Sequence, residues 1–183
     1  MNMSNLKDRK VAILTENGFE QVELLSPKQT LEEAGVEVEI VSPQKEVRAW
    51  DETDWGITIS VDKNLEEATP GDYDGLLLPG GVLNPDKLRT NKKAVDFIRH
   101  FLEAAKPIAV ICHGPQTMIE TGLLQGRKMT SYPAIKTDLI NAGVNWVDQE
   151  VVVDNGLVSS RSPKDLDAFN KKMLEELAEG IHA

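Results

Sequence analysis

The stretch Pro107-Ile-Ala-Val-Ile-Cys-His-Gly-Pro115 decides the fold of this chain, because an apolar run ends abruptly at its only cysteine, Cys112. Residues 108–111 predict a short, fully buried strand. Gly114 permits close backbone approach, and Pro115 has the backbone angle that suits the first turn of a helix. A residue between such a strand and such a helix lies on a sharp elbow, with its side chain above the sheet edge. The stretch therefore predicts an α/β domain with a nucleophile elbow at Cys112.

The setting of Cys112 favours a reactive thiolate. A helix N-terminus offers partial positive charge and free N–H groups, and His113 is the adjacent residue. Such surroundings can lower the pKa of a thiol well below its free value of about 8.5. The alternative is that Cys112 is a small buried hydrophobe, as free cysteines often are. The context between a strand and a Gly-Pro helix start favours the nucleophile.

Predicted strands and helices alternate outward from this stretch, as in a three-layer α/β/α sandwich with a mostly parallel sheet. The expected strands are 10–15, 36–41, 57–61, 73–78, 108–111, 128–131, 151–153 and 157–160. The expected helices are 21–33, 91–105, 115–121, 134–141 and 164–178. Residues 42–55 predict an irregular segment in which Trp50 and Trp55 anchor a loop or a subunit contact.

The chain of 183 residues fits one domain, 1–183, with flexible tails expected at 1–9 and 180–183. It carries 20 Lys and Arg against 30 Asp and Glu, a net charge of −10, which argues against nucleic acid and anionic membranes as partners. No stretch predicts a membrane-spanning helix or a signal peptide, and one cysteine cannot form an internal disulfide. We therefore expect a cytoplasmic protein.

Chemistry-bearing residues follow several predicted strands, whose carboxyl ends share one edge of the sheet. Glu20 and Glu23 are expected on one face at the start of the first helix. We expect Glu20 to be a solvated acid that interacts favourably with the helix dipole. Glu23 lies among apolar residues and is a candidate general acid or base. Pro79-Gly80-Gly81 predicts either a turn that presents N–H groups to an oxyanion or a plain tight turn. No cofactor motif is present, and no other potential metal ligands stand at suitable spacing from His100 or His182. We therefore expect neither a cofactor nor a metal.

Together, Leu77-Leu-Pro-Gly-Gly81 and Ala109-Val-Ile-Cys-His-Gly-Pro115 resemble the PfpI/ThiJ family of intracellular cysteine hydrolases and deglycases. Phe19-Glu-Gln-Val-Glu23 resembles the start of the family's first helix. The match covers nearly the whole chain after Lys10, with further similar blocks at 126–132, 141–143, 148–154 and 159–163. The resemblance implies a flavodoxin-like sandwich, in agreement with the pattern of elements.

The resemblance also implies catalytic roles. Cys112 matches the nucleophile, His113 its proposed base or proton shuttle, and Glu23 the acid that hydrogen-bonds the cysteine. The PfpI branch completes its proposed triad with an acid from a neighbouring subunit, and the matching residue here is Asp86. That position is usually Glu, so the side chain here is one methylene shorter. We therefore expect a homo-oligomer, a dimer or a hexamer, with Asp86 near a neighbouring site.

Oxyanion and substrate contacts are implied in the same way for Gly80, Gly81, Gly114 and Tyr132, although Tyr132 could equally serve packing. The preferred activity is stress-protective, cofactor-free hydrolysis of reactive aldehydes and their adducts, of the glyoxalase III or protein deglycase type. The first alternative is an intracellular cysteine peptidase of the PfpI type. The second is a non-enzymatic redox sensor or chaperone that uses Cys112.

Overall fold

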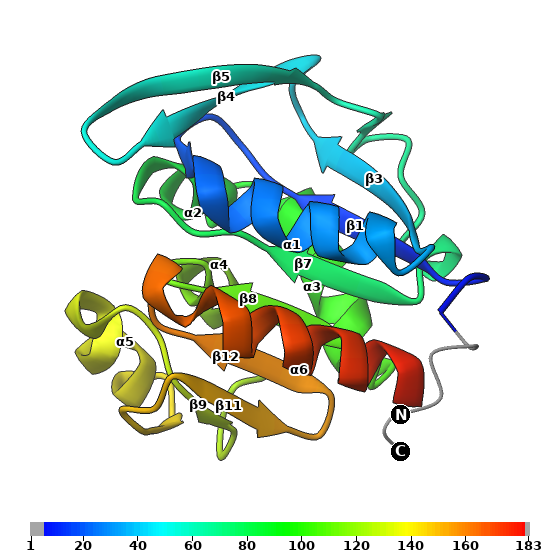
Figure 1. Cartoon of the computed structure of the whole chain (residues 1–183). Coiled ribbons are helices and arrows are strands. Elements are labelled where there is room, and N and C mark those ends of the chain that lie inside the picture. Colours follow the sequence, from blue (N-terminus) through cyan, green and yellow to red (C-terminus); the bar gives the residue numbers. More distant parts are fainter. Residues whose placement is uncertain (1–5, 182–183) are drawn as a thin grey trace.

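A seven-stranded sheet forms the middle layer of the protein in the computed structural model, which describes residues 6–181 (Figure 1). Its strand order is β11-β12-β8-β7-β1-β3-β6, and every neighbouring pair is parallel except β11 and β12. The strands are β1 (Lys10–Leu14), β3 (Glu37–Ser42), β6 (Lys63–Asn64), β7 (Gly75–Leu78), β8 (Ile108–Ile111), β11 (Val151–Asp154) and β12 (Leu157–Ser160). The predicted mostly parallel sheet is confirmed.

Helices cover both faces of this sheet, which confirms the three-layer sandwich (Figure 1). Helices α1 (Gln21–Glu33) and α6 (Leu166–Glu179) pack against each other on one face. The other face is covered mainly by α3 (Lys92–Glu103), α4 (Pro115–Ile119) and α5 (Lys136–Asn141). Short 3-10 turns, Pro70–Asp72, Pro133–Ile135 and Pro163–Asp165, connect the layers.

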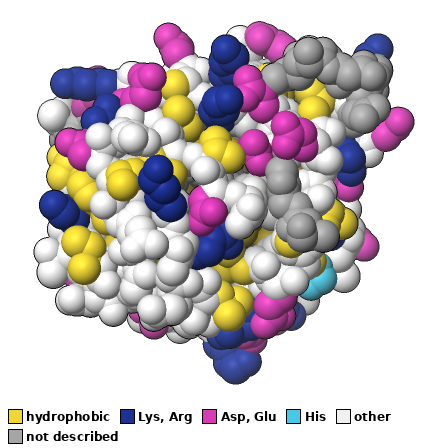
Figure 2. All heavy atoms as spheres, turned by 90° about the horizontal axis from the view of Figure 1, so that it is seen from below, with side chains coloured by type: hydrophobic (Ala, Val, Ile, Leu, Met, Phe, Trp, Pro, Cys, Tyr) yellow, Lys and Arg dark blue, Asp and Glu magenta, His cyan; other side chains and the backbone are white. Residues whose placement is uncertain are grey.

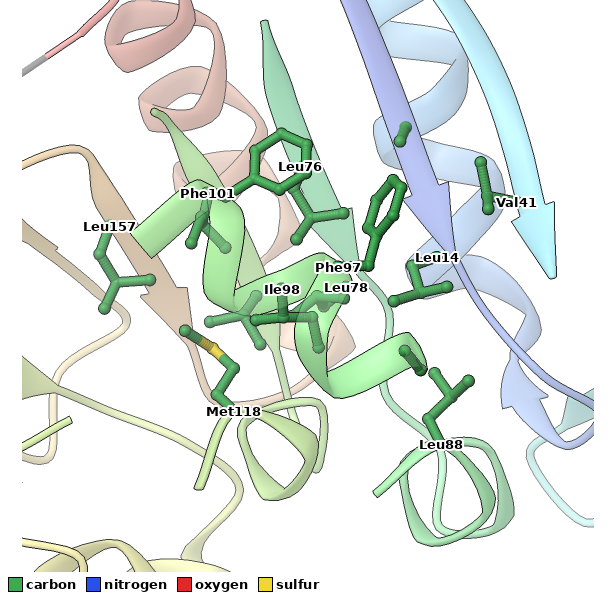
Figure 3. Close-up of a cluster of buried hydrophobic side chains, with 14 of the residues drawn as sticks. Leu14, Val41, Leu76, Leu78, Leu88, Phe97, Ile98, Phe101, Met118 and Leu157 are labelled. Atoms are coloured by element: carbon green, nitrogen blue, oxygen red, sulfur yellow. The ribbon is translucent and has the colours of Figure 1, made fainter. Parts of the chain in front are cut away.

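Successive residues of each strand contribute to two separate cores, as the period of two in a strand requires. In β1, Ala12 and Leu14 join the cluster under α3, whereas Val11 and Ile13 join the cluster under α1 and α6. Figure 3 shows the first cluster, in which Phe97 and Phe101 of α3 lie over the strands. Strands that are buried on both faces explain why their sequences are continuous apolar runs.

The segment 42–55, expected to be irregular, forms most of a hairpin. Strand β4 (Glu46–Asp51) pairs antiparallel with β5 (Asp54–Ser60), which also contains most of the strand expected at 57–61. Trp50 and Trp55 are cross-strand partners with ring centroids 5.5 Å apart. The prediction of an irregular segment was wrong because polar residues interrupt the alternation of apolar residues that marks a strand. The cross-strand contact between the two tryptophan rings stabilises the hairpin instead.

Helix α2 (Leu83–Leu88) was also unexpected, as were the two-residue strands β2 (Phe19–Glu20) and β10 (Asn145–Trp146). Strand β10 pairs with β9 (Lys128–Met129). The Pro in Asn84-Pro85-Asp86 indicated a loop, but it lies in the first turn of α2, where a proline is tolerated. Expected helices elsewhere begin or end within a few residues of the observed ones. Helix α3 begins at the Asn91 side chain, which accepts hydrogen bonds from the N–H groups of Lys93 and Ala94.

Parts of the expected tails, 1–5 and 182–183, lie outside the described residues. Leu6 is fully buried in the core, and Arg9 pairs with Asp74 at 3.1 Å, so part of the expected N-terminal tail is packed against the domain. Within residues 6–181, no helix is both long enough and apolar enough to cross a bilayer. On the face shown in Figure 2, Lys and Arg side chains lie scattered among Asp and Glu rather than in one positive patch.

Candidate active site

Cys112 lies on the predicted elbow, directly after β8. Its φ of +61° is in the left-handed region, which residues other than glycine rarely adopt. Two backbone hydrogen bonds hold this conformation: the Cys112 N–H donates to the Ser160 carbonyl at 3.1 Å, and the Tyr132 N–H donates to the Cys112 carbonyl at 2.9 Å. Strain of this kind persists only where the surroundings determine the conformation, and it is typical of functional sites.

Gly114 allows helix α4 to start tightly beneath the elbow. A Cβ at this position would lie 2.8 Å from Val110 Cγ2 and 2.9 Å from the Leu78 carbonyl oxygen. The Gly114 N–H donates to the Ile111 carbonyl at 3.0 Å, so it is already used within the turn. Gly114 therefore packs closely within the elbow, and its expected contact with substrate stays a prediction.

His113 contacts the Cys112 thiol although adjacent side chains usually diverge. Its Nδ1 lies 3.2 Å from Cys112 Sγ. Burial lowers the pKa of the His113 imidazole, so the ring is neutral at pH 7 and can accept a proton. The contact supports the expected role of His113 as base or proton shuttle.

Glu23, in the first turn of α1, is fully buried beside the thiol. Its Oε2 accepts a hydrogen bond from the Gly80 N–H at 2.9 Å, whereas its buried Oε1 has no hydrogen-bond partner among the described residues. Burial raises the pKa of this carboxyl to about 8, although its contacts with Cys112 and the Gly80 N–H act in the opposite direction. Glu23 is therefore protonated at neutral pH and can donate a proton.

The predicted lowering of the cysteine pKa is wrong for this geometry. Burial raises the pKa of the Cys112 thiol, and the negative charge of an ionised Glu23 raises it further. The N–H groups of Gly81 and His113 favour the thiolate but have smaller effects. Helix α4 has only five residues, which limits the stabilisation that its N-terminus can give. The thiol and the carboxyl therefore titrate as a coupled pair.

Gly80 and Gly81 form the tight turn after β7, and only glycine fits at both positions. A Cβ on Gly80 would lie 2.6 Å from both Cys112 Cβ and Glu23 Oε2, and a Cβ on Gly81 would lie 2.4 Å from the Gly18 carbonyl oxygen. The Gly80 N–H donates to Glu23 and so holds the acid in place, while the expected role of Gly80 toward a substrate oxygen stays a prediction. The Gly81 N–H lies near the sulfur, as expected for a donor in the site.

Asn84, which the sequence did not single out, braces this turn from α2. Its side chain is buried and donates to the carbonyls of Pro79 and Gly80 at 3.0 and 3.1 Å. It also accepts the Glu16 N–H at 2.7 Å. Asn84 follows the glycine turn by three residues, and an asparagine near a turn is too common a sequence pattern to reveal such a contact.

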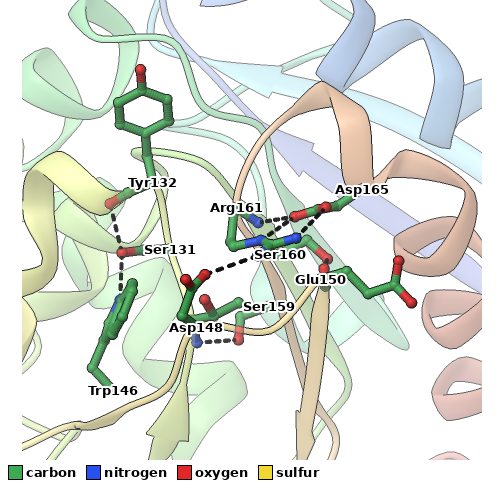
Figure 4. Close-up of polar contacts among 10 residues, drawn as sticks. Ser131, Tyr132, Trp146, Asp148, Glu150, Ser159, Ser160, Arg161 and Asp165 are labelled. Atoms are coloured by element: carbon green, nitrogen blue, oxygen red, sulfur yellow. Dashed lines mark hydrogen bonds and ion pairs between the residues drawn. The ribbon is translucent and has the colours of Figure 1, made fainter.

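Tyr132 forms an aromatic wall beside the imidazole. Its ring stacks on His113 with centroids 4.7 Å apart and remains partly exposed. The Ser131 hydroxyl accepts from Trp146 Nε1 at 3.0 Å and donates to the Tyr132 carbonyl at 2.9 Å, which fixes this segment (Figure 4). The stack supports the expected contact of Tyr132 with the site.

These groups surround a pocket of about 470 Å³ with Cys112 and Glu23 in its lining. Glu20 also lines the pocket, which corrects the expectation of a simple solvated acid: it is half-buried, and its Oε1 accepts the Glu52 N–H at 3.2 Å. The β4–β5 hairpin supplies Trp50 and Glu52, and the sequence did not indicate that these residues reach the site.

Residues 9–176 match the DJ-1/PfpI family. The chain belongs to this family. It is 47% identical over 168 residues to Deglycase PH1704 of Pyrococcus horikoshii, a match that covers 92% of this chain and 99% of the relative. It is also 42% identical over 171 residues to a Bacillus subtilis protein named "Putative cysteine protease YraA", covering 92% and 98% of the two chains. The crystal structure of Drosophila melanogaster DJ-1beta superposes with a TM-score of 0.83 at 28% identity, over 93% of this chain and 90% of that one.

One expected catalytic residue of this DJ-1/PfpI domain lies apart from the others. Asp86 is exposed on α2 and is not among the residues that line the pocket around Cys112. The Asp86 side chain is therefore exposed to solvent in the single chain.

The described part of this DJ-1/PfpI domain, residues 6–181, contains no cluster of three or more His, Cys, Asp or Glu side chains that could hold a metal ion. His100 lies in α3 with its ring edge-on to Phe101 at 5.9 Å, and His182 lies outside the described residues.

Proposed function

We propose that this protein is a stress-protective, cofactor-free cysteine hydrolase of reactive aldehydes such as methylglyoxal and of their early adducts on amino and thiol groups. The observation that carries the proposal is the placement of the protonated Glu23 carboxyl beside the Cys112 thiol, in a small pocket. A relative with 47% identity is named a deglycase, which supports the same reaction class.

The first step is attack by sulfur on the aldehyde carbon. The thiol proton passes to the neutral His113, 3.2 Å away, and the carbon–sulfur bond forms as the carbonyl oxygen takes a proton from Glu23. The product is a hemithioacetal on Cys112. Where the aldehyde is bound to an amine, the carbon–nitrogen bond breaks in this step and the proton goes to the leaving nitrogen.

The second step moves protons within the hemithioacetal. Glu23, now a carboxylate, removes the proton from the carbon bonded to sulfur, and the protonated His113 gives its proton to the neighbouring carbonyl oxygen, which forms an enediol. The hydroxyl on the sulfur-bonded carbon then returns a proton to His113, and Glu23 delivers its proton to the neighbouring carbon. This converts the hemithioacetal of methylglyoxal into a lactoyl thioester without any net redox change. Water then cleaves the thioester, which releases lactate and restores the thiol.

The Gly81 and His113 N–H groups supply the electrostatic part of the reaction. Both lie near the sulfur and favour its thiolate form. Backbone donors fixed in a low-dielectric site stabilise developing charge without reorganising. The positive φ at Cys112 and the Gly80-Gly81 turn hold these donors in place before the substrate arrives.

A peptidase is the second candidate, because a hollow of about 700 Å³ adjoins the pocket and shares Glu52, Tyr132 and Pro163 with it. An extended peptide could lie there with its scissile bond near Cys112. A relative that is named for cysteine protease activity supports this reading. The third candidate, a redox sensor or chaperone, would use Cys112 by oxidation to sulfenic or sulfinic acid.

We further propose that the protein acts in the cytoplasm as a homo-oligomer, a dimer or a hexamer, in which Asp86 approaches the site of a neighbouring protomer. The single cysteine suits a reducing compartment, and the exposed position of Asp86 leaves its carboxylate accessible to another chain.

The deciding experiment supplies the purified protein with methylglyoxal in the absence of glutathione and measures lactate. We expect turnover by the wild type and none by Cys112→Ser. Casein and fluorogenic peptides are tested in parallel: cleavage that disappears in the same variant, without lactate formation, would establish the peptidase instead. Protection of client proteins by Cys112→Ser would show that the thiol is not the functional centre.

A further inference from the structure

The left-handed backbone of Cys112 depends on two neighbouring segments of the chain. Its N–H donates to the Ser160 carbonyl at 3.1 Å, and its own carbonyl accepts the Tyr132 N–H at 2.9 Å. A residue other than glycine keeps a positive φ only where its surroundings determine the conformation. The groups that hold residues 132 and 160 in place therefore also decide where the Cys112 sulfur lies.

The chain is anchored immediately after Ser160 by the side chain of Arg161 (Figure 4). The guanidinium donates from Nε to Asp165 Oδ2 at 2.9 Å and from Nη2 to Asp165 Oδ1 at 3.0 Å, and the Arg161 N–H donates to Asp165 Oδ2 at 3.0 Å. Two parallel bonds of this kind form a fork that adds geometric specificity as well as energy. Only 5% of the Asp165 side chain is exposed, so the fork ties the end of β12 to the buried turn before α6.

The third nitrogen of the guanidinium reaches the loop between β10 and β11, residues 147–150. Nη1 of Arg161 donates to Asp148 Oδ1 at 2.8 Å. Two residues later, the Glu150 carbonyl accepts the Ser160 hydroxyl at 2.6 Å. The end of β12 is thus held from two sides, by the turn before α6 and by this loop.

The same stretch of chain supports the second segment that fixes Cys112. Trp146, directly before the loop, donates from Nε1 to the hydroxyl of Ser131, the residue that precedes Tyr132, at 3.0 Å. The Lys136 ammonium lies 4.9 Å from the centre of the Trp146 ring and covers it. Figure 4 shows Trp146 and Asp148 with these partners on the two segments. Residues 146–150, which we call the outer brace, therefore contact both supports of the elbow.

These supporting side chains lie outside the pocket that contains the sulfur. Arg161, Asp148 and Asp165 line the adjoining hollow and are not among the residues that line the pocket around Cys112. A small aldehyde bound at the sulfur is therefore out of their reach. An effect of Arg161 on the reaction has to pass through the backbone of Ser160.

We propose that Arg161 is a positioning residue for Cys112: through its fork with Asp165 and its bond to Asp148, it holds the Ser160 carbonyl that keeps the elbow in its reactive conformation. The outer brace joins this support to that of the Tyr132 segment. The effect of Arg161 on turnover rests on the proposed function, whereas its effect on the thiol does not.

Thiol reactivity tests the positioning role without turnover. Cys112 is the only cysteine, so alkylation of the folded protein by iodoacetamide reports on this sulfur alone. We expect Arg161→Gln to be alkylated about tenfold faster than the wild type at pH 8, because a released elbow exposes the thiol to water and burial is the main cause of its raised pKa. Arg161→Lys keeps the charge without the fork and should show the same increase. Rates equal to that of the wild type in both variants would overturn the proposal, as would full restoration by Arg161→Lys.

Arg127 provides a matched control on the same pair of strands. Its Nε donates to Asp154 Oδ2 at 2.9 Å, at the end of the β11–β12 pairing opposite to Ser160. Arg127→Gln removes a comparable ion pair and should leave alkylation unchanged, and thermal unfolding of each variant records the loss of stability separately. Asp148→Asn alters a side chain that is 68% exposed, so it serves if Arg161→Gln does not fold, and it should show a smaller increase in the same direction. Equal acceleration in Arg127→Gln, or none in Asp148→Asn and Arg161→Lys, would overturn the proposal.

Lactate formation from methylglyoxal connects the support of the elbow to the reaction. Arg161→Gln should lower kcat about tenfold or more with little change in KM, because displaced reacting groups are costly and Arg161 does not line the pocket. A change confined to KM would assign Arg161 to substrate binding and overturn the proposal. Faster alkylation in the variant of a protein that forms no lactate would overturn the proposed function and leave the positioning role. Lactate formation with an unchanged kcat would retain the function and overturn the positioning role.

Discussion

Cys112 Sγ and His113 Nδ1 lie 3.2 Å apart although the two residues are consecutive in the chain. Consecutive side chains normally point away from each other, whereas here both lie on the elbow at which Cys112 has a left-handed φ of +61°. The stack of His113 on Tyr132 then fixes the ring in that position. The elbow and the aromatic stack thus hold a thiol and an imidazole within 3.2 Å of each other.

The coupling of Glu23 and Cys112 predicts a change in thiol reactivity. Glu23→Gln removes the negative charge that raises the pKa of Cys112 and supplies an amide N–H that can donate to the thiolate. The pH at which iodoacetamide alkylates half-maximally should therefore fall relative to the wild type. Catalysis should fall at the same time, by about 100-fold or more, because the proton donor is lost. An unchanged or higher alkylation midpoint would contradict the coupling.

The same carboxyl predicts a pH dependence of stability. Its pKa is raised from 4.5 to about 8 in the folded protein, so the folded state binds more protons than the unfolded state between these values. This contribution is fully present below pH 4.5 and is lost as pH rises through about 8, by at most about 5 kcal/mol. Urea unfolding at several pH values should show a smaller decline for Glu23→Gln, and equal slopes would count against the assignment.

Gly80 should tolerate no side chain. Gly80→Ala places a Cβ 2.6 Å from both Cys112 Cβ and Glu23 Oε2, so the elbow or the acid has to move. We expect a loss of about 1–3 kcal/mol in stability and near-complete loss of turnover. Gly71→Ala is the matched control, because its new Cβ would meet only one atom, at 4.0 Å. Thermal unfolding and lactate formation of both variants provide the comparison, and a fully active Gly80→Ala would refute the geometry.

Asp86 should matter only in the assembled protein. If its carboxylate orients His113 of a neighbouring protomer, Asp86→Asn should lower turnover about tenfold or more while the chain stays folded. Asp167→Asn, which changes an exposed aspartate on α6, should have no such effect. Light scattering measures the oligomer in each case. A monomer, or full activity in Asp86→Asn, would remove Asp86 from the reaction.

Much of the fold follows from local pattern. The apolar run before Cys112, the turn at Gly80-Gly81 and the helix that contains Glu23 were all predicted, because strands buried on both faces and glycine turns are visible in neighbouring residues. The hairpin of Trp50 and Trp55 was not predicted, since its stability comes from a cross-strand contact that polar residues conceal.

The sequence by itself determined the elbow and the parallel sheet, because these depend on short-range periodicity and on glycine and proline positions, while its resemblance to a known family supplied the expected roles of Cys112, His113 and Glu23. Only the tertiary structure decided the proton affinities and the pocket lining. Burial of Glu23 and Cys112 outweighs the helix terminus that favoured a thiolate, and β4–β5 brings Trp50 and Glu52 to the site. Both results depend on segments far apart in the chain, whose approach no local pattern records.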